Sequence, residues 1–208
     1  MSNDKHYYEW YALLSICYLL KLDIDDFEHK DRPDLQSNIN NIGIEVVRAI
    51  TQEQGLTYSL INTYFGKGLS GEEIVKLIQK NNKKNKFKGT VSSVNGKAVI
   101  SNTKELYDSN IHKLQVIEKI ERKAKLFENY IKFKINGLYC FTQTGLINEK
   151  DYPDIIIACN NSPFDIVFIN CINRILLWNK QPNCIIEHII SYDLLSKWDK
   201  EALNKYGI

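Results

Sequence analysis

The chain opens with apolar residues at helical spacing and soon changes to the alternation typical of a β-strand. Tyr7–Lys21 contains neither glycine nor proline, and its apolar positions predict a mostly buried helix. Ile42–Val47 alternates with a period of two, which puts its even-numbered aliphatic residues on one face of a strand. Glu45 and Val47 are therefore expected on the opposite face.

The middle of the chain returns to helical spacing and then gives a hairpin signal. Arg48–Tyr64 predicts a second helix, and Ser70 is a candidate N-cap with Glu73 three residues later, opening a short helix that ends at Gln79. Thr90–Ser101 consists of two short strand-like runs around an Asn-Gly dipeptide, which favours a two-residue hairpin turn. A β-hairpin is therefore predicted here.

The second half adds further helices and strands. A charged, periodic segment over 104–133 predicts one long helix. Its candidate inward residues are Leu106, Leu114, Ile117, Ile120, Leu126 and Tyr130. Strands are predicted over 138–142, 164–170 and 174–178, residues 153–158 fit either state, and a last helix begins near Ser191. The expected fold is α/β, with a central mixed sheet that has Ile42–Val47 inside it and is flanked by the Tyr7–Lys21 and Arg48–Tyr64 helices.

Composition favours one intracellular domain over 1–208. The 208 residues are 44% hydrophobic, and 27 basic against 25 acidic residues give a net charge of only +2, so any nucleic-acid partner must meet a local patch. Five widely spaced cysteines are expected to be buried free thiols, with no zinc-binding pair among them. No signal peptide or apolar span of about 18 residues occurs, which predicts a cytoplasmic protein without a membrane partner. The oligomeric state stays open.

The residues with a chemical pattern lie between the first helix and the first long strand. Pro33-Asp34 is followed, about ten residues later, by Glu45 on an apolar strand, and Glu9 stands on the preceding helix. This arrangement resembles the PD-(D/E)XK, or restriction-endonuclease-like, nuclease superfamily over roughly residues 8–58. The resemblance implies a restriction-endonuclease-like sheet and a metal site formed by Asp34 and Glu45, with Glu9 either as a further ligand or as a hydrogen-bond acceptor behind the ligands. The β-hairpin predicted above is then an insertion in this fold.

The carboxylates also have a physical reading of their own. Two carboxylates about 4 Å apart repel each other by about 4 kcal/mol at an effective dielectric constant near 20, so a cation between them favours their ionised forms. Mg²⁺ suits such a pair because it takes oxygen ligands and keeps waters for a phosphodiester and a nucleophile. Magnesium-dependent hydrolysis of DNA or RNA is therefore the first functional hypothesis.

One position departs from the family pattern. The family places a lysine two residues after the strand carboxylate, and this chain has Val47 there. Arg48 is the nearest basic substitute in the sequence and is taken as a candidate catalytic residue. Gln54 and Tyr58 match the spacing of the QxxxY element that some family nucleases place after the catalytic strand.

Each of these residues also has a structural interpretation. Glu9 fits a first-turn acid favoured by the helix dipole, Asp34 fits a turn residue, and Glu45 fits an ion pair with Arg32 or Arg48. Two further functional hypotheses follow: a catalytically inactive nuclease fold that binds nucleic acid or a protein partner, and an unrelated α/β protein whose two acids lie far apart.

A basic, low-complexity run precedes the hairpin. Its residues 80–88 are expected to form a loop and, together with the hairpin, an insertion over 80–101. The lysines predicted to contact phosphate groups are Lys83, Lys84, Lys86 and Lys88. The alternative is that the run is only a solvated loop.

Overall fold

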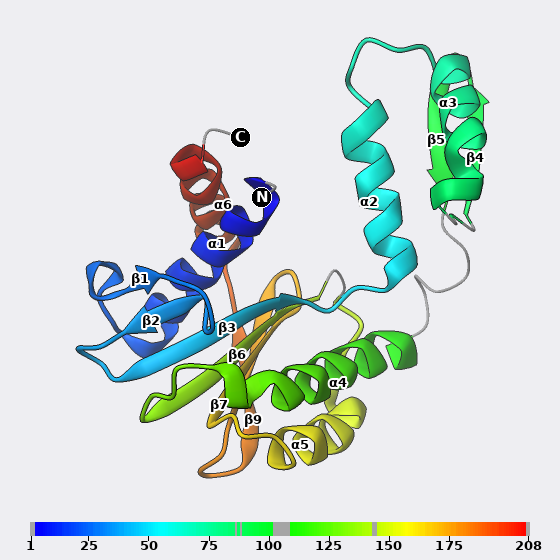
Figure 1. Ribbon diagram of the computed structural model, residues 1–208. Coiled ribbons are helices and arrows are strands. Elements are labelled where there is room, and N and C mark those ends of the chain that lie inside the picture. The colour runs from blue at the N-terminus through cyan, green and yellow to red at the C-terminus, as the bar shows by residue number, and fades with distance from the viewer. Residues whose placement is uncertain (1–2, 86, 88, 102–108, 143–144, 207–208) are drawn as a thin grey trace. The chain divides into compact units, whose positions relative to one another are not determined.

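The computed structural model describes residues 3–85, 87, 89–101, 109–142 and 145–206 (Figure 1). The chain forms two compact units, here called the sheet unit, residues 1–49 and 112–208, and the inserted unit, residues 50–111. The insertion expected over 80–101 lies within the inserted unit, which already begins at Ile50.

The sheet unit is built on a mixed seven-stranded sheet in the order β1-β2-β3-β6-β7-β8-β9. The strands are β1 Glu28–His29, β2 Leu35–Ser37, β3 Ile42–Arg48, β6 Ile135–Phe141, β7 Ile166–Asn170, β8 Arg174–Asn179 and β9 Cys184–Ile189. The strands β3, β6 and β7 run parallel to one another, and every other neighbouring pair is antiparallel. The coarse prediction of an α/β protein with a mixed sheet is confirmed.

Helices cover both faces of this sheet (Figure 1). One face packs against α1 Asn3–Leu20 and α6 Tyr192–Tyr206, and the other against α4 Ser109–Leu126 and α5 Tyr152–Asn160. Short 3₁₀ turns, η1 Ile24–Asp26, η3 Phe127–Asn129 and η4 Glu149–Asp151, lie between these elements. Among the described residues, no helix is both long and apolar enough to cross a bilayer.

The strand β3 sits inside the sheet between β2 and β6, as its alternation predicts. Ile42 and Ile44 belong to the core on the α1 side, whereas Val47 belongs to the core on the α4 side. Because both faces are covered, both sets of side chains are buried. The alternation therefore fixes which helix layer each β3 side chain meets, and Glu45 points toward the α4 layer.

Gly43 leaves room for the segment that carries Asp34. A Cβ added at Gly43 would lie 2.4 Å from the Phe133 ring and 2.8 Å from the Pro33 ring. Only a residue without a side chain allows both rings to pack against β3 at this point. The glycine thereby brings the Pro33-Asp34 segment close to the strand.

The predicted helix over Arg48–Tyr64 differs from the structure at its start. Arg48 is still paired with Phe141 in the parallel β3–β6 ladder, and α2 spans Gln52–Tyr64. Thr51 caps this helix through its side chain, which makes Gln52 the first helical residue. This helix belongs to the inserted unit, and within the sheet unit the helices that pack on the sheet are α1, α4, α5 and α6.

The inserted unit has a small core of its own. It contains α2, α3 Gly71–Asn85, β4 Thr90–Val94 and β5 Lys97–Ser101, and its buried side chains are Leu60, Ile74, Ile78 and Phe87. The strands β4 and β5 pair as predicted, with Asn95 at φ 51° and Gly96 at φ 73°, the positive values that a type I′ turn requires. The hairpin prediction is confirmed.

The helix α3 corrects the expected boundary of the basic run. The predicted capping box is present, because Ser70 and Glu73 exchange hydrogen bonds of 2.8 Å and 3.3 Å. The helix continues beyond Gln79 to Asn85, so the first part of the run is helical and not a loop. Lysine has a high helix propensity, which allows this extension.

The stripe predicted for α4 is only partly correct. Ile120 and Tyr130 are buried as predicted, whereas Leu114 and Leu126 are 53% and 44% exposed, so their assignment as inward residues is wrong. Val116 and, just beyond the helix, Phe127 complete the buried stripe. Residues 102–108, at the start of the predicted long helix, lie outside the described residues.

The cysteines match the expectation of free thiols. Cys17, Cys140, Cys159 and Cys171 are buried, Cys184 is partly exposed, and none forms a disulfide. Burial raises the pKa of the Cys159 thiol to about 12, which keeps this group protonated at neutral pH.

Candidate functional site

Asp34 and Glu45 lie side by side on one face of the sheet. The antiparallel register pairs Leu35 with Ile44, so the same register places Asp34 opposite Glu45. Residues that face each other across neighbouring strands project to the same side. Both side chains are buried, and Asp34 Oδ2 accepts a 2.9 Å hydrogen bond from the backbone N–H of Val46.

These two acids line a cavity of about 370 Å³, here called the acidic cavity. Its lining residues are Asp31, Arg32, Asp34, Glu45, Val46, Lys123, Leu126, Asn129 and Tyr130. The lining thus contains three carboxylates, those of Asp31, Asp34 and Glu45, and two cationic side chains, those of Arg32 and Lys123. All of these residues belong to the sheet unit.

Lys123 is a residue of the acidic cavity that the sequence analysis did not single out. It stands on α4, and its Nζ donates a short hydrogen bond to Glu45 Oε1. The lysine side chain is 16% exposed and that of Glu45 is 7% exposed, so the pair is largely removed from water. The cation that pairs with Glu45 is therefore Lys123, and not Arg32 or Arg48.

The sequence does contain a signal for this lysine. Val116, Ile120 and Phe127 form the buried stripe at the end of α4, and Lys123 occupies the position between Ile120 and Phe127 on the same stripe. A lysine in an apolar stripe requires a buried anionic partner or an escape to water. Because the apolar residues before and after it face the sheet, position 123 is expected to face the sheet as well.

Val47 is a core residue on the same face of β3 as Glu45. It is only 7% exposed and packs in the hydrophobic core between β3 and α4. Because α4 covers this face, the long Lys123 side chain reaches the Glu45 carboxylate from the helix.

Two polar atoms in the acidic cavity are fully buried and make no hydrogen bond of ordinary geometry within the described part of the chain. They are Glu45 Oε2 and the Tyr130 hydroxyl oxygen, which lie close to each other. Burial first, and then the charge and acceptor oxygens of Glu45 and the charge of Asp34, raise the pKa of the Tyr130 phenol, while Arg32 lowers it. The phenol therefore stays protonated and remains a hydrogen-bond donor near two carboxylates.

The loop that carries Asp34 is held by backbone hydrogen bonds. Ile131 N donates to Arg32 O at 3.0 Å, which fastens the loop to the segment after α4, and Lys30 N donates to Asp34 O at 3.0 Å. Gln36 Nε2 donates to Pro33 O at 2.9 Å. The Arg32 side chain is itself 63% exposed and lies 3.5 Å from Asp31, so it remains available at the cavity rim.

Glu9 and Arg48 are not among the residues of the acidic cavity. Glu9 is buried on α1, where its Oε2 lies 3.2 Å from His6 Nδ1 and 3.7 Å from His29 Nδ1. The Arg48 guanidinium lies 4.5 Å from the centre of the Tyr8 ring, also on α1. Both residues thus lie on the α1 side of the sheet, whereas Glu45 lies on the α4 side.

The remaining candidates belong to the inserted unit. Gln54 Oε1 accepts a 2.8 Å hydrogen bond from Thr51 N and closes the capping box of α2, so Gln54 has a local structural role. Tyr58 follows it on α2, and its side chain lies outside the described part of the structure. Lys83 and Lys84 stand in the last turns of α3, with side chains outside that part, and Lys86 and Lys88 are themselves outside the described residues.

The acidic cavity offers two carboxylates on the same side of the sheet, those of Asp34 and Glu45. Mg²⁺ commonly binds through one or two carboxylates and keeps several waters. Glu45 Oε2 is buried beside the Tyr130 phenol, and Glu45 Oε1 accepts the hydrogen bond of Lys123. Among the described residues there is no group of three or more His, Cys, Asp or Glu side chains placed to hold a metal. Any further ligands would therefore be water or substrate oxygens.

Comparison of the chain with protein-family models, curated proteins and solved structures gives no match. A function for this chain is therefore inferred from its fold and from the acidic cavity.

Proposed function

We propose that the protein is a magnesium-dependent phosphodiesterase acting on DNA or RNA, with the acidic cavity as its active site. The single observation that carries the proposal is the meeting of Asp34, Glu45 and Lys123 in one buried hollow. Two carboxylates and one lysine are the residue types that the resemblance to PD-(D/E)XK nucleases implies for the reaction. The restriction-endonuclease-like fold remains part of the same proposal.

Each residue has a chemical role in this account. Asp34 and Glu45 hold the metal ion, which when bound supplies Lewis-acid stabilisation of the phosphate and lowers the pKa of a bound water. Lys123 takes the place of the lysine that Val47 replaces, orienting a water or stabilising negative charge on the phosphate. The protonated Tyr130 phenol is a neutral donor to a phosphate oxygen.

One set of observations favours a second candidate, a nuclease-like protein that binds nucleic acid without cutting it. Lys123 already neutralises part of the Glu45 charge, and the acidic cavity offers only a few acids for a metal. In this case the Lys123–Glu45 ion pair would stabilise the fold and take no part in a reaction. A cleavage assay separates the two candidates, because only the first requires turnover.

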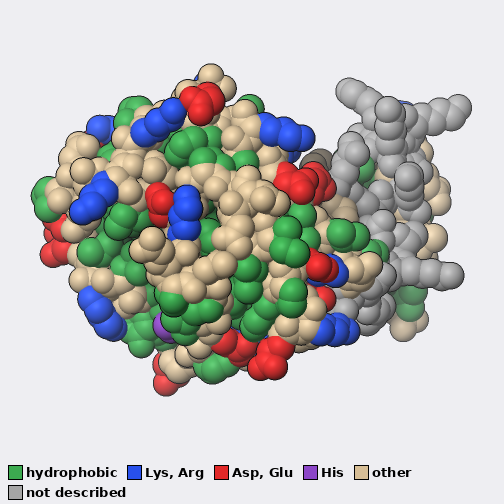
Figure 2. Space-filling model, turned by 90° about the horizontal axis from the view of Figure 1, so that it is seen from below, with side chains coloured by type: hydrophobic (Ala, Val, Ile, Leu, Met, Phe, Trp, Pro, Cys, Tyr) green, Lys and Arg blue, Asp and Glu red, His purple; other side chains and the backbone are tan. Residues whose placement is uncertain are grey.

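The charge distribution limits how substrate is attracted. On the side of α4 and α5, the described Lys and Arg side chains are interspersed with Asp and Glu, and no continuous basic surface is visible among them (Figure 2). The acidic cavity itself offers two cations for local phosphate contacts, Arg32 and Lys123.

The test is cleavage of supercoiled plasmid, single-stranded DNA and single-stranded RNA by the purified protein with and without Mg²⁺. The wild type is expected to cut at least one substrate only when Mg²⁺ is present. Asp34→Ala and Lys123→Met are each expected to lower the rate by about 10²–10³-fold, the usual cost of removing a group that stabilises transition-state charge.

Lys119→Met is the matched control for Lys123→Met. Lys119 lies one turn earlier on α4 and pairs at 3.2 Å with the exposed Glu118, away from the acidic cavity. This variant should cleave at the wild-type rate. Binding of the oligonucleotides without Mg²⁺-dependent cleavage would reject the phosphodiesterase proposal and favour the binding protein.

A further inference from the structure

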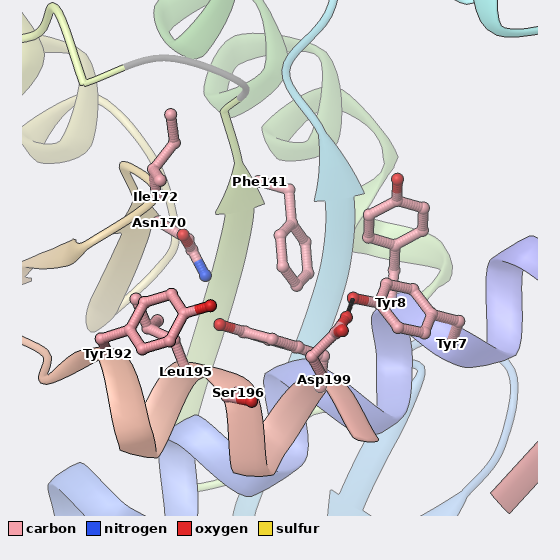
Figure 3. A pocket seen from close by; sticks show the side chains of 10 residues that line it. Tyr7, Tyr8, Phe141, Asn170, Ile172, Tyr192, Leu195, Ser196 and Asp199 are labelled. Carbon is pink, nitrogen blue, oxygen red and sulfur yellow. Dashed lines mark hydrogen bonds between the residues drawn. The ribbon is translucent and has the colours of Figure 1, made fainter. Parts of the chain in front are cut away.

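A second cavity lies on the opposite, α1 side of the sheet, at the carboxyl ends of parallel strands. It is here called the aromatic cavity and has a volume of about 390 Å³ (Figure 3). Phe141 and Asn170, the last residues of β6 and β7, form its floor, and α1 and α6 supply its walls. In open α/β sheets this edge is the usual place for a small ligand, and the volume suits one.

Aromatic rings dominate the walls of the aromatic cavity. They come from Tyr7, Tyr8, Tyr11, Phe141 and Tyr192. Phe141 contacts two of the tyrosines edge to face, at 5.0 Å from Tyr8 and 5.7 Å from Tyr11. The faces of such rings carry negative electrostatic potential and attract cations.

The structure already contains an example of this attraction on α1. The Arg48 guanidinium stacks on Tyr8 at 4.5 Å, although Arg48 is not among the residues that line the cavity.

Among the described residues that line the aromatic cavity, Asp199 is the one with a charged side chain. Its Oδ1 accepts a 2.6 Å hydrogen bond from the Tyr7 hydroxyl, and Figure 3 shows this pair at the cavity wall. Burial and then the charge of Asp199 raise the pKa of Tyr11 to about 12, so the field of this carboxylate extends across the hollow while both tyrosines stay neutral. The described lining of the cavity thus carries one negative charge and no cation.

We infer that the aromatic cavity binds a small organic cation, an ammonium group carried on an aromatic or apolar body. The ammonium lies toward Asp199, and the body packs against the tyrosine rings, Ile172 and Leu195. The Asn170 side chain and the Ser196 hydroxyl supply polar groups for orientation. Phosphates and carboxylates are repelled by Asp199, which separates this site from the proposed phosphodiesterase chemistry on the other face.

Three probes of similar shape and different charge test this site. Phenethylamine is cationic at neutral pH, phenethyl alcohol is neutral and phenylacetate is anionic. Each is titrated into the full-length protein and followed by amide NMR shifts. Phenethylamine is expected to bind more tightly than the alcohol by about tenfold, with phenylacetate weakest and the shifts centred on Ile172, Leu195 and Ser196.

Asp199→Asn removes the charge while keeping the shape and an acceptor for Tyr7. It should abolish the preference for phenethylamine over phenethyl alcohol, whereas Asp193→Asn, an equal charge change on the first turn of α6, should keep it. Tyr192→Leu removes a ring that is 83% exposed and therefore tests the aromatic wall without endangering folding. It should weaken phenethylamine and phenethyl alcohol alike, by severalfold, because both probes carry the ring that packs against the tyrosines.

Three results would overturn the inference. They are equal or absent binding of the three probes, an unchanged preference in Asp199→Asn, and shifts that map to another surface. None of them depends on whether the acidic cavity cleaves nucleic acid.

Discussion

Replacing Lys123 by methionine is expected to destabilise the protein by about 3 kcal/mol, because the Glu45 carboxylate then stays buried without its cation. Asp34 adds to the cost, since two neighbouring acids remain in the acidic cavity. Methionine keeps the length and apolar stem of lysine, so lost packing contributes little. The measurement is urea denaturation of wild type and variant with a metal chelator present.

Two variants separate the ion pair from general effects of changing α4. Lys119→Met should cost less than about 1 kcal/mol: the Lys119 side chain is only 12% exposed, but its partner Glu118 is 65% exposed, so the change leaves no charge buried. The double variant Lys123→Met/Glu45→Leu should recover most of the stability lost by Lys123→Met, because no unpaired charge remains buried. Equal losses for Lys123→Met and Lys119→Met would show that the buried pair is not a structural element of the fold.

Replacing Tyr139 by alanine is expected to cost about 4 kcal/mol, the range for removing a fully buried ring. Tyr139 lies on the interior strand β6, stacks on Phe168 at 5.6 Å and is hydrogen-bonded to Ser15 at 2.8 Å and to Asn170 at 3.0 Å. It therefore joins α1, β6 and β7 in the centre of the α1-side core. Chemical denaturation measures the loss.

Tyr139→Phe separates the ring from its hydroxyl. It should cost only about 1–2 kcal/mol, since Ser15 keeps a hydrogen bond to Ala12 O at 2.9 Å and only the Asn170 amide loses its acceptor. Tyr192→Ala, at an exposed tyrosine, should change stability by less than about 0.5 kcal/mol. If Tyr139→Phe lowered the free energy of unfolding as much as Tyr139→Ala, the hydroxyl hydrogen bonds and not the packing of the ring would be the source of the stability.

Local patterns predict the elements that carry the two acids. The alternation of Ile42–Val47 predicts that Glu45 and Val47 share a face, and β3 confirms it. The Asn38–Asn41 turn region is short, so β2 must return beside β3 and Asp34 must lie near Glu45. Sequence periodicity is enough to predict a contact when the two contacting residues are close in the chain.

Contacts between distant segments were not predicted. Lys123 is 78 positions from Glu45, and the inserted unit separates the two in the chain. The helical pattern around Glu9 predicts a helix, but it does not determine which face of the sheet this helix covers. The sequence therefore could not show whether Glu9 would lie near Glu45. Arg48 lies away from the acidic cavity because of strand alternation. The even-numbered side chains of β3 point to the α1 side of the sheet, where the Arg48 guanidinium stacks on the Tyr8 ring.

The most direct test of the acidic cavity is the binding of Mn²⁺, which takes the same oxygen ligands as Mg²⁺ and can be counted by electron paramagnetic resonance of the free ion. The wild type is predicted to bind Mn²⁺, Glu45→Gln to bind it at least about tenfold more weakly, and Glu9→Gln to bind it like the wild type. Glu9 is the matched control, since it is an equally buried glutamate on the other face of the sheet. Loss of Mn²⁺ binding in Glu9→Gln but not in Glu45→Gln, or no binding by the wild type, would contradict a metal site at Asp34 and Glu45.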